Sequence, residues 1–310
     1  RWWQNPATLQ WGPVIGSSSG GIYSRWRRTP SSPYRWRNMG RNLPNPSVGA
    51  FQIHPTDFRR VIVGTGDWAR YAGAGIFRTS DGGETWVRAA ITGSVGETLT
   101  PRAVTGMEYG LVNGTTSGQL DTNTLYASTD LGFLKSSDGG ATWQRKTVVT
   151  GIPQIALNSM AADRRNQGVI YVASTLVPGA SGLPPTAPYG VYRSTDGGEN
   201  WSPSNNGLLP PSALGASLSL AIAPSNSAIL YAAISDNSVG AGGIYRSTDS
   251  GGRWDRVCVI DSLLGYMRAG QGIHVNCIAV HPTNPNTVYA GSVGLIKSTN
   301  GGGNWRGIDG

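Results

Sequence analysis

The chain has 310 residues, and its 25 Lys and Arg against 17 Asp and Glu give a formal net charge of +8. Its 45 glycines and a hydrophobic content of 38% are typical of many short strands joined by tight turns. No run of 18 apolar residues occurs, which excludes a helical membrane span. Two cysteines exclude a disulfide scaffold, and whether Cys258 and Cys277 pair is left open. Because the first residue is Arg1 rather than Met, we expect the chain to be processed or shortened.

The first unit of the chain is degenerate. Residues 14–16 and 21–23 match the second and third strands of later units, and residues 34–36 match the fourth. Its first strand would lie at or before residues 1–3, so we expect that strand to be truncated or supplied by chain outside this sequence.

Five further units follow, each with four runs of β-branched and aromatic residues bounded by Gly, Pro and Asn, the signature of strands and hairpins. The predicted strands are residues 48–53, 61–64, 75–78 and 86–89; 104–109, 124–127, 133–135 and 143–148; 155–161, 169–173, 190–193 and 201–203; 218–223, 229–233, 243–246 and 254–259; and 275–280, 287–291, 295–298 and 305–308.

Four-stranded antiparallel units of about 50 residues are typical of β-propeller blades. We therefore predict an all-β fold, with a single β-propeller domain over residues 1–310. Its six blades would lie at about 1–41, 42–90, 91–150, 151–206, 207–260 and 261–310. A seven-bladed ring that includes these six, and a solenoid, are the alternatives.

A seven-residue motif, Ser-Asp-Gly-Gly-Glu-Thr-Trp at residues 80–86, recurs between the third and fourth strands of five units. Its tryptophans are 57, 58, 53 and 51 residues apart. The acidic or amide residue and the tryptophan of each copy are Asp81 and Trp86, Asp138 and Trp143, Asp196 and Trp201, Asp249 and Trp254, and Asn300 and Trp305.

This motif resembles the Asp-box, or BNR repeat, of sialidases, sortilin-type receptors and xyloglucanase-type glycoside hydrolases. The resemblance covers five of the six units and implies a structural role, away from the usual binding face. We expect each carboxylate to accept backbone N–H groups of its own hairpin, and the glycines to adopt positive φ. The tryptophan would begin the fourth strand and cover the adjoining apolar layer. One carboxylate per turn provides too few ligands to bind a calcium ion, so we do not interpret the boxes as calcium sites. Asn300 lacks the charge, so the last box should be slightly weaker.

Catalytic candidates are the aspartates that end second strands: Asp67, Asp130 and Asp236. The segment 127–132 is similar to the Thr-Asp-x-Gly turn of xyloglucanase-type hydrolases, which implies a catalytic role for Asp130. In that family two carboxylates come from two propellers that face a shared cleft, and this chain holds one propeller. The structural alternative is a turn aspartate that binds its own backbone.

A sialidase-like site is a weaker alternative. The segment 28–30 loosely resembles the motif that carries that family's first arginine, but Glu108 and Tyr109 are adjacent on a strand and so point to opposite faces. His54 and His281 occupy equivalent turns and are interpreted as structural. We find no metal-ligand cluster and no phosphate-binding loop, so neither a metal nor a cofactor is expected.

The positive charge is concentrated at the N-terminus, where residues 1–56 hold seven arginines and no Asp or Glu. Arginine pairs well with carboxylate, sulfate and phosphate and stacks on aromatic rings. The candidate binding residues, including one blade-2 loop, are Arg25, Trp26, Arg27, Arg28, Arg35, Trp36, Arg37, Arg41, Trp68, Arg70 and Tyr71. The structural alternative packs Trp26 and Trp36 between blades and leaves the arginines solvated.

From these observations we predict a non-catalytic, extracytoplasmic binding propeller. Its partner would be a protein or an anionic glycan, held by the loop face and the Arg/Trp-rich first blade. Nucleic acid is not expected, because no nucleic-acid-binding motif accompanies the charge. The alternatives are a glycoside hydrolase that uses loop-face aspartates, and an assembly factor or accessory subunit of a larger complex.

Overall fold

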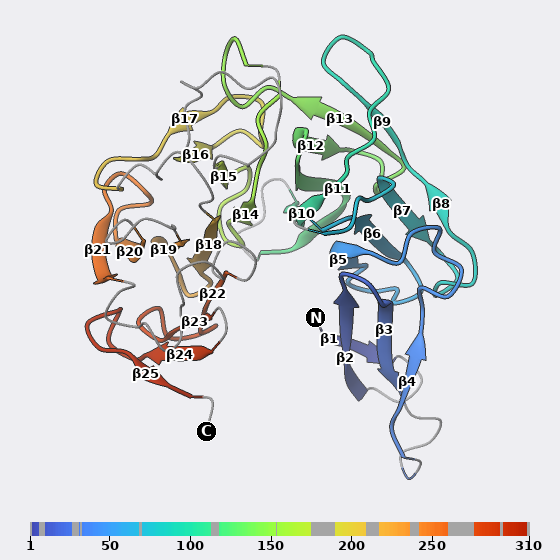
Figure 1. The fold of residues 1–310 in the computed structure, drawn as a ribbon, viewed down its shortest axis with the longest axis horizontal. Coiled ribbons are helices and arrows are strands. Elements are labelled where there is room, and N and C mark those ends of the chain that lie inside the picture. Colours follow the sequence, from blue (N-terminus) through green and yellow to red (C-terminus); the bar gives the residue numbers. More distant parts are fainter. Residues whose placement is uncertain are drawn as a thin grey trace. The chain divides into compact units, whose positions relative to one another are not determined.

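The computed structural model describes residues 2–5, 10–26, 31, 33–67, 70–112, 118–152, 154–174, 190–208, 217–235, 242–259, 276–291 and 294–308. For residues 2–5, 10–12 and 26 it describes the backbone alone. Throughout this part of the chain the regular elements are strands, which form six sheets (Figure 1). Five of these sheets have four antiparallel strands, and the remaining one adds a fifth, parallel strand to such a set. The fold is therefore an all-β propeller, as predicted.

Each sheet is one blade. Blade 1 holds β1 (Trp2–Asn5), β2 (Gln10–Ser17), β3 (Gly21–Trp26) and β4 (Arg35–Asn38). Blade 2 holds β5 (Val48–Ile53), β6 (Val61–Thr65), β7 (Ile76–Thr79) and β8 (Val87–Arg88). Blade 3 holds β10 (Val104–Leu111), β11 (Leu120–Thr129), β12 (Gly132–Ser136) and β13 (Thr142–Lys146). Blade 4 holds β14 (Ser159–Ala162), β15 (Ile170–Ser174), β16 (Gly190–Ser194) and β17 (Ser202–Pro203). Blade 5 holds β18 (Ser217–Ala223), β19 (Asn226–Ser235), β20 (Gly243–Ser247) and β21 (Asp255–Val259). Blade 6 holds β22 (Cys277–Val280), β23 (Val288–Gly291), β24 (Leu295–Ser298) and β25 (Arg306–Gly307).

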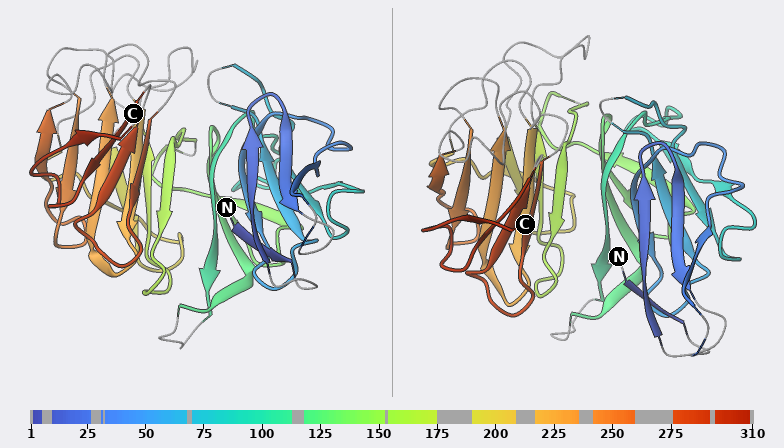
Figure 2. Two further views of the ribbon diagram at one scale, coloured as in Figure 1. Left: turned by 90° about the horizontal axis from the view of Figure 1, so that it is seen from below. Right: turned by 60° about the horizontal axis from the view of Figure 1, so that its bottom comes forward.

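The chain divides into two compact units, which we describe separately. The first comprises residues 1–110 and 120–146 and carries blades 1 to 3; the second comprises residues 111–119 and 147–310 and carries blades 4 to 6. Within each unit, neighbouring blades pack face to face (Figure 2). The apolar residues between blades 2 and 3 include Ile62, Val104 and Leu134, and those between blades 4 and 5 include Val191 and Leu230.

Blade 3 has a fifth strand that the sequence did not predict. β9 (Ala90–Thr92) lies between the predicted strands at residues 86–89 and 104–109, yet it pairs with β13 in parallel, with Ile91 opposite Trp143. Ile91 is buried in the apolar layer between blades 2 and 3. Burial of this single isoleucine stabilises the short strand. The strand was not predicted because its pairing partner lies about 50 residues further along the chain.

Blade 1 differs from the sequence-based expectation at its first strand. β1 forms within this chain and pairs antiparallel with β2, with Trp2 opposite Pro13 and Asn5 opposite Gln10. The expected alternative in which chain outside this sequence supplies the first strand is therefore wrong.

The Asp-box hairpins have the predicted hydrogen bonds, as the box of blade 3 shows. Asp138 Oδ1 accepts the N–H groups of Ala141 and Thr142, each at 2.9 Å, and Oδ2 accepts the Thr142 hydroxyl at 2.7 Å. The Ser136 hydroxyl donates to Asp138 at 2.9 Å and accepts the Gly140 N–H at 3.0 Å. An equivalent hydroxyl is present in the other boxes, at Thr79, Ser194, Ser247 and Ser298. The box is thus a latch between the third and fourth strands.

The first glycine of each box has a left-handed backbone, with φ between 71° and 78° in Gly82, Gly139, Gly197 and Gly301. In blade 5 this position is Ser250, whose φ of 60° makes it the one described non-glycine residue with positive φ. A side chain in this conformation costs about 1 kcal/mol. We therefore expect Ser250→Gly to stabilise the protein by about 0.5–1 kcal/mol, measured by urea unfolding. Gly82→Ser should destabilise it by a similar amount, and equal stability of both variants would contradict the backbone argument.

The latches predict a loss of stability in acid. Slight burial raises the pKa of Asp196, but hydrogen bonds from Asn200 outweigh it and lower that pKa to about 2. A carboxyl group whose pKa is lower in the folded state stabilises the fold above its unfolded pKa, about 3.9, and this contribution disappears as the pH falls toward the folded value. We expect the melting temperature to fall between pH 4 and pH 2, and Asp196→Asn to flatten this dependence. Parallel melting curves of the two proteins over this range would contradict it.

Candidate functional site

The candidate site is built on the turn between β11 and β12. Residues 129–132 form this turn, which the Thr129 hydroxyl closes by donating to the Gly132 carbonyl at 2.8 Å and accepting the Leu131 N–H at 3.1 Å. Gly132 has φ of 117°, a conformation that favours glycine. The short turn places Asp130 at the end of the second strand of blade 3, as the sequence predicts.

The carboxyl group of Asp130 does not bind its own turn in the way that the box aspartates do. Its Oδ1 accepts the backbone N–H groups of Arg102 and Ala103, at 3.0 and 3.1 Å, just before β10 begins. Its own N–H donates to the Ala103 carbonyl at 3.1 Å. Burial raises the pKa of Asp130 above its ordinary value, although these backbone hydrogen bonds oppose the shift. This carboxyl group therefore holds a proton to higher pH than the carboxyl groups of the boxes.

The loop between β6 and β7 of blade 2 reaches the same place. The Arg102 carbonyl accepts the Gly73 N–H at 2.6 Å, while the Arg102 N–H donates to Asp130. Asp67 lies at the start of this loop and accepts the Arg70 N–H at 2.7 Å. The structure thus connects the loop of Asp67 to Asp130 through one peptide segment. Sequence reasoning missed Arg102, because a backbone group that binds a carboxylate leaves no signature in the side chains.

Several predicted site residues lie outside the described part of the chain: Arg27, Arg28, Trp68 and Asp236, together with the side chain of Trp26. Of the others, Arg35, Arg41 and Arg70 are exposed and Tyr71 is 46% exposed. The Arg25 guanidinium lies 4.2 Å from the ring centre of Tyr34, and Arg37 forms an ion pair with Glu84. Trp36 is 50% exposed, so it does not pack between blades.

The described residues contain no group of three or more His, Cys, Asp or Glu that could hold a metal ion, and Cys258 and Cys277 do not form a disulfide with each other. No described helix is long and apolar enough to cross a membrane. In the sialidase-like alternative, Tyr109 is buried against His54, while Glu108 accepts the Gln52 side-chain amide at 3.2 Å. Both residues thus contact side chains of blade 2 and help to pack blade 2 against blade 3.

Comparisons with known proteins agree with the repeat and the fold. The BNR/Asp-box repeat family matches residues 192–203. The chain is a BNR/Asp-box β-propeller, and it shares its fold with GH74 xyloglucanases. A xyloglucanase of Acetivibrio thermocellus is 25% identical over 292 residues, which is 84% of this chain and 32% of that protein.

Two solved structures share the fold. The GH74 xyloglucanase of Xanthomonas campestris superposes with a TM-score of 0.59 at 17% identity, over 96% of this chain and 44% of that one. A YCF48 protein bound to a D1 peptide gives 0.54 at 15% identity, over 96% and 78%. At these identities both show the fold alone. The chain spans 16% to 32% of the length of the curated relatives that it matches.

These relatives correct the functional expectation drawn from the sequence. A non-catalytic binding propeller was predicted, but the curated relatives are named as xyloglucanases and favour the alternative, a glycoside hydrolase. The expectation rested on the N-terminal arginines. In the structure Arg37 forms an ion pair with Glu84, and Arg25 stacks on Tyr34. Two of these arginines therefore have partners within the chain itself.

Proposed function

We propose that this chain is part of a glycoside hydrolase that acts on a xyloglucan-type polysaccharide, with Asp130 as one of its catalytic carboxyl groups. The relatives support the reaction class. The observation that carries the assignment to Asp130 is its half-buried carboxyl group at the end of β11, bound through Oδ1 to the Arg102 and Ala103 N–H groups. No described side chain binds the other oxygen, which leaves it available to a substrate.

The contrast with the box aspartates supports a role as general acid. Burial acts to raise the pKa of Asp138, but the hydrogen bonds within its hairpin together outweigh it and keep that pKa below its ordinary value. At Asp130, burial outweighs the hydrogen bonds and raises the pKa above its ordinary value. A general acid works best when its pKa is close to the working pH, and a raised carboxyl pKa is how glycosidases achieve this. Asp130 is therefore better suited to donate a proton than any box aspartate.

Glycoside cleavage needs a second carboxyl group. Asp67 is the candidate within the described residues, because its loop and Asp130 both bind the backbone of Arg102. The resemblance to xyloglucanase-type hydrolases implies another source for the second carboxyl group, namely a second propeller that faces the first across a cleft. Asp67→Asn distinguishes the two: unchanged hydrolysis would remove Asp67 from the mechanism.

A polysaccharide substrate also has a consequence for location. Such polymers do not cross a lipid bilayer, so an enzyme that cleaves them meets its substrate outside the cytoplasm. We extend the proposal to an extracytoplasmic protein whose partner is a glycan. Detection of the protein only in the cytosolic fraction of its source cells would contradict this part.

The proposal is tested by incubating the protein that carries this chain with xyloglucan and, separately, with an unbranched β-glucan. New reducing ends are then measured. We expect release from xyloglucan in excess of release from the unbranched polymer. No release from either, by a protein shown to be folded by its circular dichroism, would contradict the hydrolase proposal.

A further inference from the structure

The turn that carries Asp130 has a counterpart in blade 2. At the end of β6 the Thr65 hydroxyl donates to the Gly75 carbonyl at 2.7 Å and accepts the N–H of the residue before that glycine at 2.8 Å. The Thr129 hydroxyl makes the same two kinds of hydrogen bond in blade 3. The residue after the threonine is Gly66 in blade 2 and Asp130 in blade 3. A glycine therefore takes the place of the candidate acid.

The backbones of Gly66 and Asp130 correspond as well. The Gly66 N–H donates to the Ser47 carbonyl at 2.8 Å, and the Asp130 N–H donates to the Ala103 carbonyl at 3.1 Å. Ser47 and Ala103 each stand directly before the first strand of their blade, β5 and β10. The two positions are thus equivalent in the repeat and differ in their side chains.

The space beside Gly66 is filled by the segment that joins blade 2 to blade 3. A Cβ on Gly66 would overlap the Arg102 carbonyl oxygen and would lie 2.6 Å from the Gly73 nitrogen. The Gly73 N–H donates to that same carbonyl at 2.6 Å. Gly66 is buried and has a left-handed backbone, with φ of 92°. Any side chain at this position would therefore displace the Arg102 carbonyl.

The Arg102 carbonyl and the Ala103 N–H belong to one peptide group. The carbonyl accepts the Gly73 N–H, while the N–H donates to Asp130 Oδ1 at 3.1 Å. Because the peptide group is planar, the position of the carbonyl fixes the direction of the N–H. Hydrogen bonds in such a chain also polarise one another, so each strengthens the next. The base of the blade 2 loop therefore directs a donor at the candidate acid of blade 3.

We propose that Gly66 is a positioning residue for Asp130, because its lack of a side chain lets the Arg102 carbonyl lie at the base of the blade 2 loop. The peptide held there directs the Ala103 N–H at the carboxylate. Burial raises the pKa of this carboxyl group, while the Ala103 and Arg102 N–H groups and the charge of Arg102 act to lower it. The catalytic meaning of this contact rests on the hydrolase proposal, whereas the contact itself does not.

The first test uses the unaltered protein and needs no substrate. Its backbone amide resonances are followed by NMR between about pH 3 and pH 8, the range in which a carboxyl group with a raised pKa loses its proton. The charged carboxylate attracts the Ala103 N–H more strongly, and the polarised Arg102 carbonyl then attracts the Gly73 amide proton. We expect the Ala103 and Gly73 amides to share one titration midpoint, which Asp130→Asn removes. A Gly73 amide that does not follow this midpoint would overturn the proposal.

The second test is Gly66→Ala. Its methyl group should displace the Arg102 peptide and weaken the hydrogen bond from Ala103 to Asp130, which stabilises the charged form of the carboxyl group. We expect the pKa of Asp130, measured from its carboxyl carbon resonance, to rise by about one unit.

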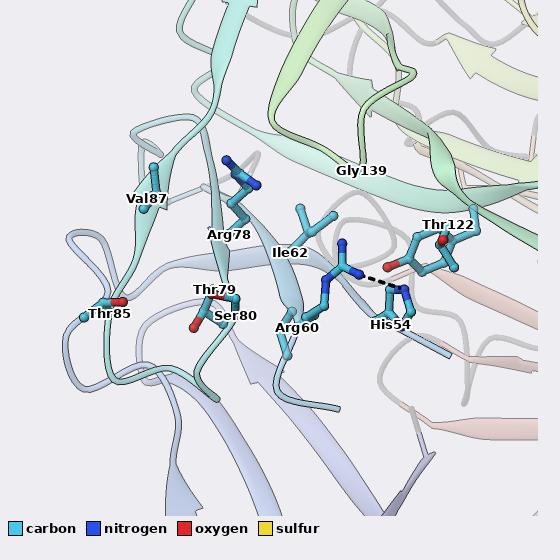
Figure 3. A pocket seen from close by; sticks show the side chains of 12 residues that line it. His54, Arg60, Ile62, Arg78, Thr79, Ser80, Thr85, Val87, Thr122 and Gly139 are labelled. Atoms are coloured by element: carbon cyan, nitrogen blue, oxygen red, sulfur yellow. Dashed lines mark hydrogen bonds between the residues drawn. The ribbon is translucent and has the colours of Figure 1, made fainter. Parts of the chain in front are cut away.

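Gly139→Ala is the matched control. Gly139 also has a left-handed backbone, with φ of 71°, but it lies beyond the other end of β12, where it lines a pocket together with Ile62 and Arg60 (Figure 3). The heavy atoms nearest to a Cβ on Gly139 are 3.6 Å away, so the methyl group has room. The pKa of Asp130 should therefore stay unchanged in this variant.

The kinetic readout connects this contact to catalysis. The kcat/KM of an enzyme that uses a general acid falls as the pH rises through the pKa of that acid. Gly66→Ala should move this fall to higher pH by the same amount as the measured pKa of Asp130, and Gly139→Ala should leave it in place.

The outcomes separate the two proposals. An unchanged pKa of Asp130 in a folded Gly66→Ala protein, or an equal rise in Gly139→Ala, would overturn the role of Gly66. If Gly66→Ala does not fold, the titration of the unaltered protein decides. Absence of hydrolysis together with a shared midpoint of the Ala103 and Gly73 amides would contradict the hydrolase proposal alone.

Discussion

Replacement of Asp130 by asparagine is expected to lower the rate of xyloglucan hydrolysis by about 10²–10⁴-fold, the usual contribution of a general acid or base. The amide keeps an oxygen that can accept the Arg102 and Ala103 N–H groups, so the turn and the fold should persist. Only the titrating proton is lost. Initial rates of reducing-end release, measured with both proteins at the same concentration, check this.

Asp138→Asn is the matched control, because it changes the same chemical group in the same blade. Asp138 binds only its own hairpin, and Asn300 shows that an amide fills this role in the box of blade 6. The control should retain full activity. Equal loss in both variants would point to a general structural effect, and full activity of Asp130→Asn would remove Asp130 from the reaction.

The largest effect on stability is expected for Trp143→Ala, which should lower the free energy of unfolding by about 3–5 kcal/mol. Trp143 is 1% exposed and packs with Ile62, Ile91 and Leu134 between blades 2 and 3. Its indole N–H donates to the Gly140 carbonyl at 3.1 Å. Removal of the ring leaves a large cavity and an unpaired carbonyl. Urea unfolding, with the slope of the transition compared as well as its midpoint, measures the loss.

Trp201→Ala tests whether burial, rather than the motif, decides this cost. Trp201 occupies the same box position and donates to the Gly198 carbonyl at 3.0 Å, but it is only partly buried. We expect less than half of the loss seen for Trp143→Ala, because less apolar surface returns to water. Equal losses would show that the indole acts through its hairpin alone.

Most of the fold could be predicted from the sequence. Strands such as Val48–Ile53 and Leu295–Ser298 have the predicted bounds, because apolar runs with Gly and Pro at their ends determine them locally. β9 was missed because its partner β13 is far along the chain. A three-residue strand has no pattern of its own and forms only where a distant strand edge offers it hydrogen bonds.

The candidate site was predictable only in part. Asp130 is visible in the sequence as a turn residue, whereas its donors are peptide groups that the fold brings from the segment before β10.

The sequence by itself determined the repeat, the propeller class and the latch of each box, because spacing, turn residues and strand pattern are local properties. It presented Asp130 and Asp138 as similar residues, each after a serine or threonine and close to a glycine. Only the tertiary structure separated them. Burial raises the pKa of Asp130. At Asp138 burial also acts to raise the pKa, but several hydrogen bonds within its own hairpin together outweigh it and lower that pKa. A carboxyl pKa depends on burial and on donors from neighbouring strands, and packing alone brings both to the group.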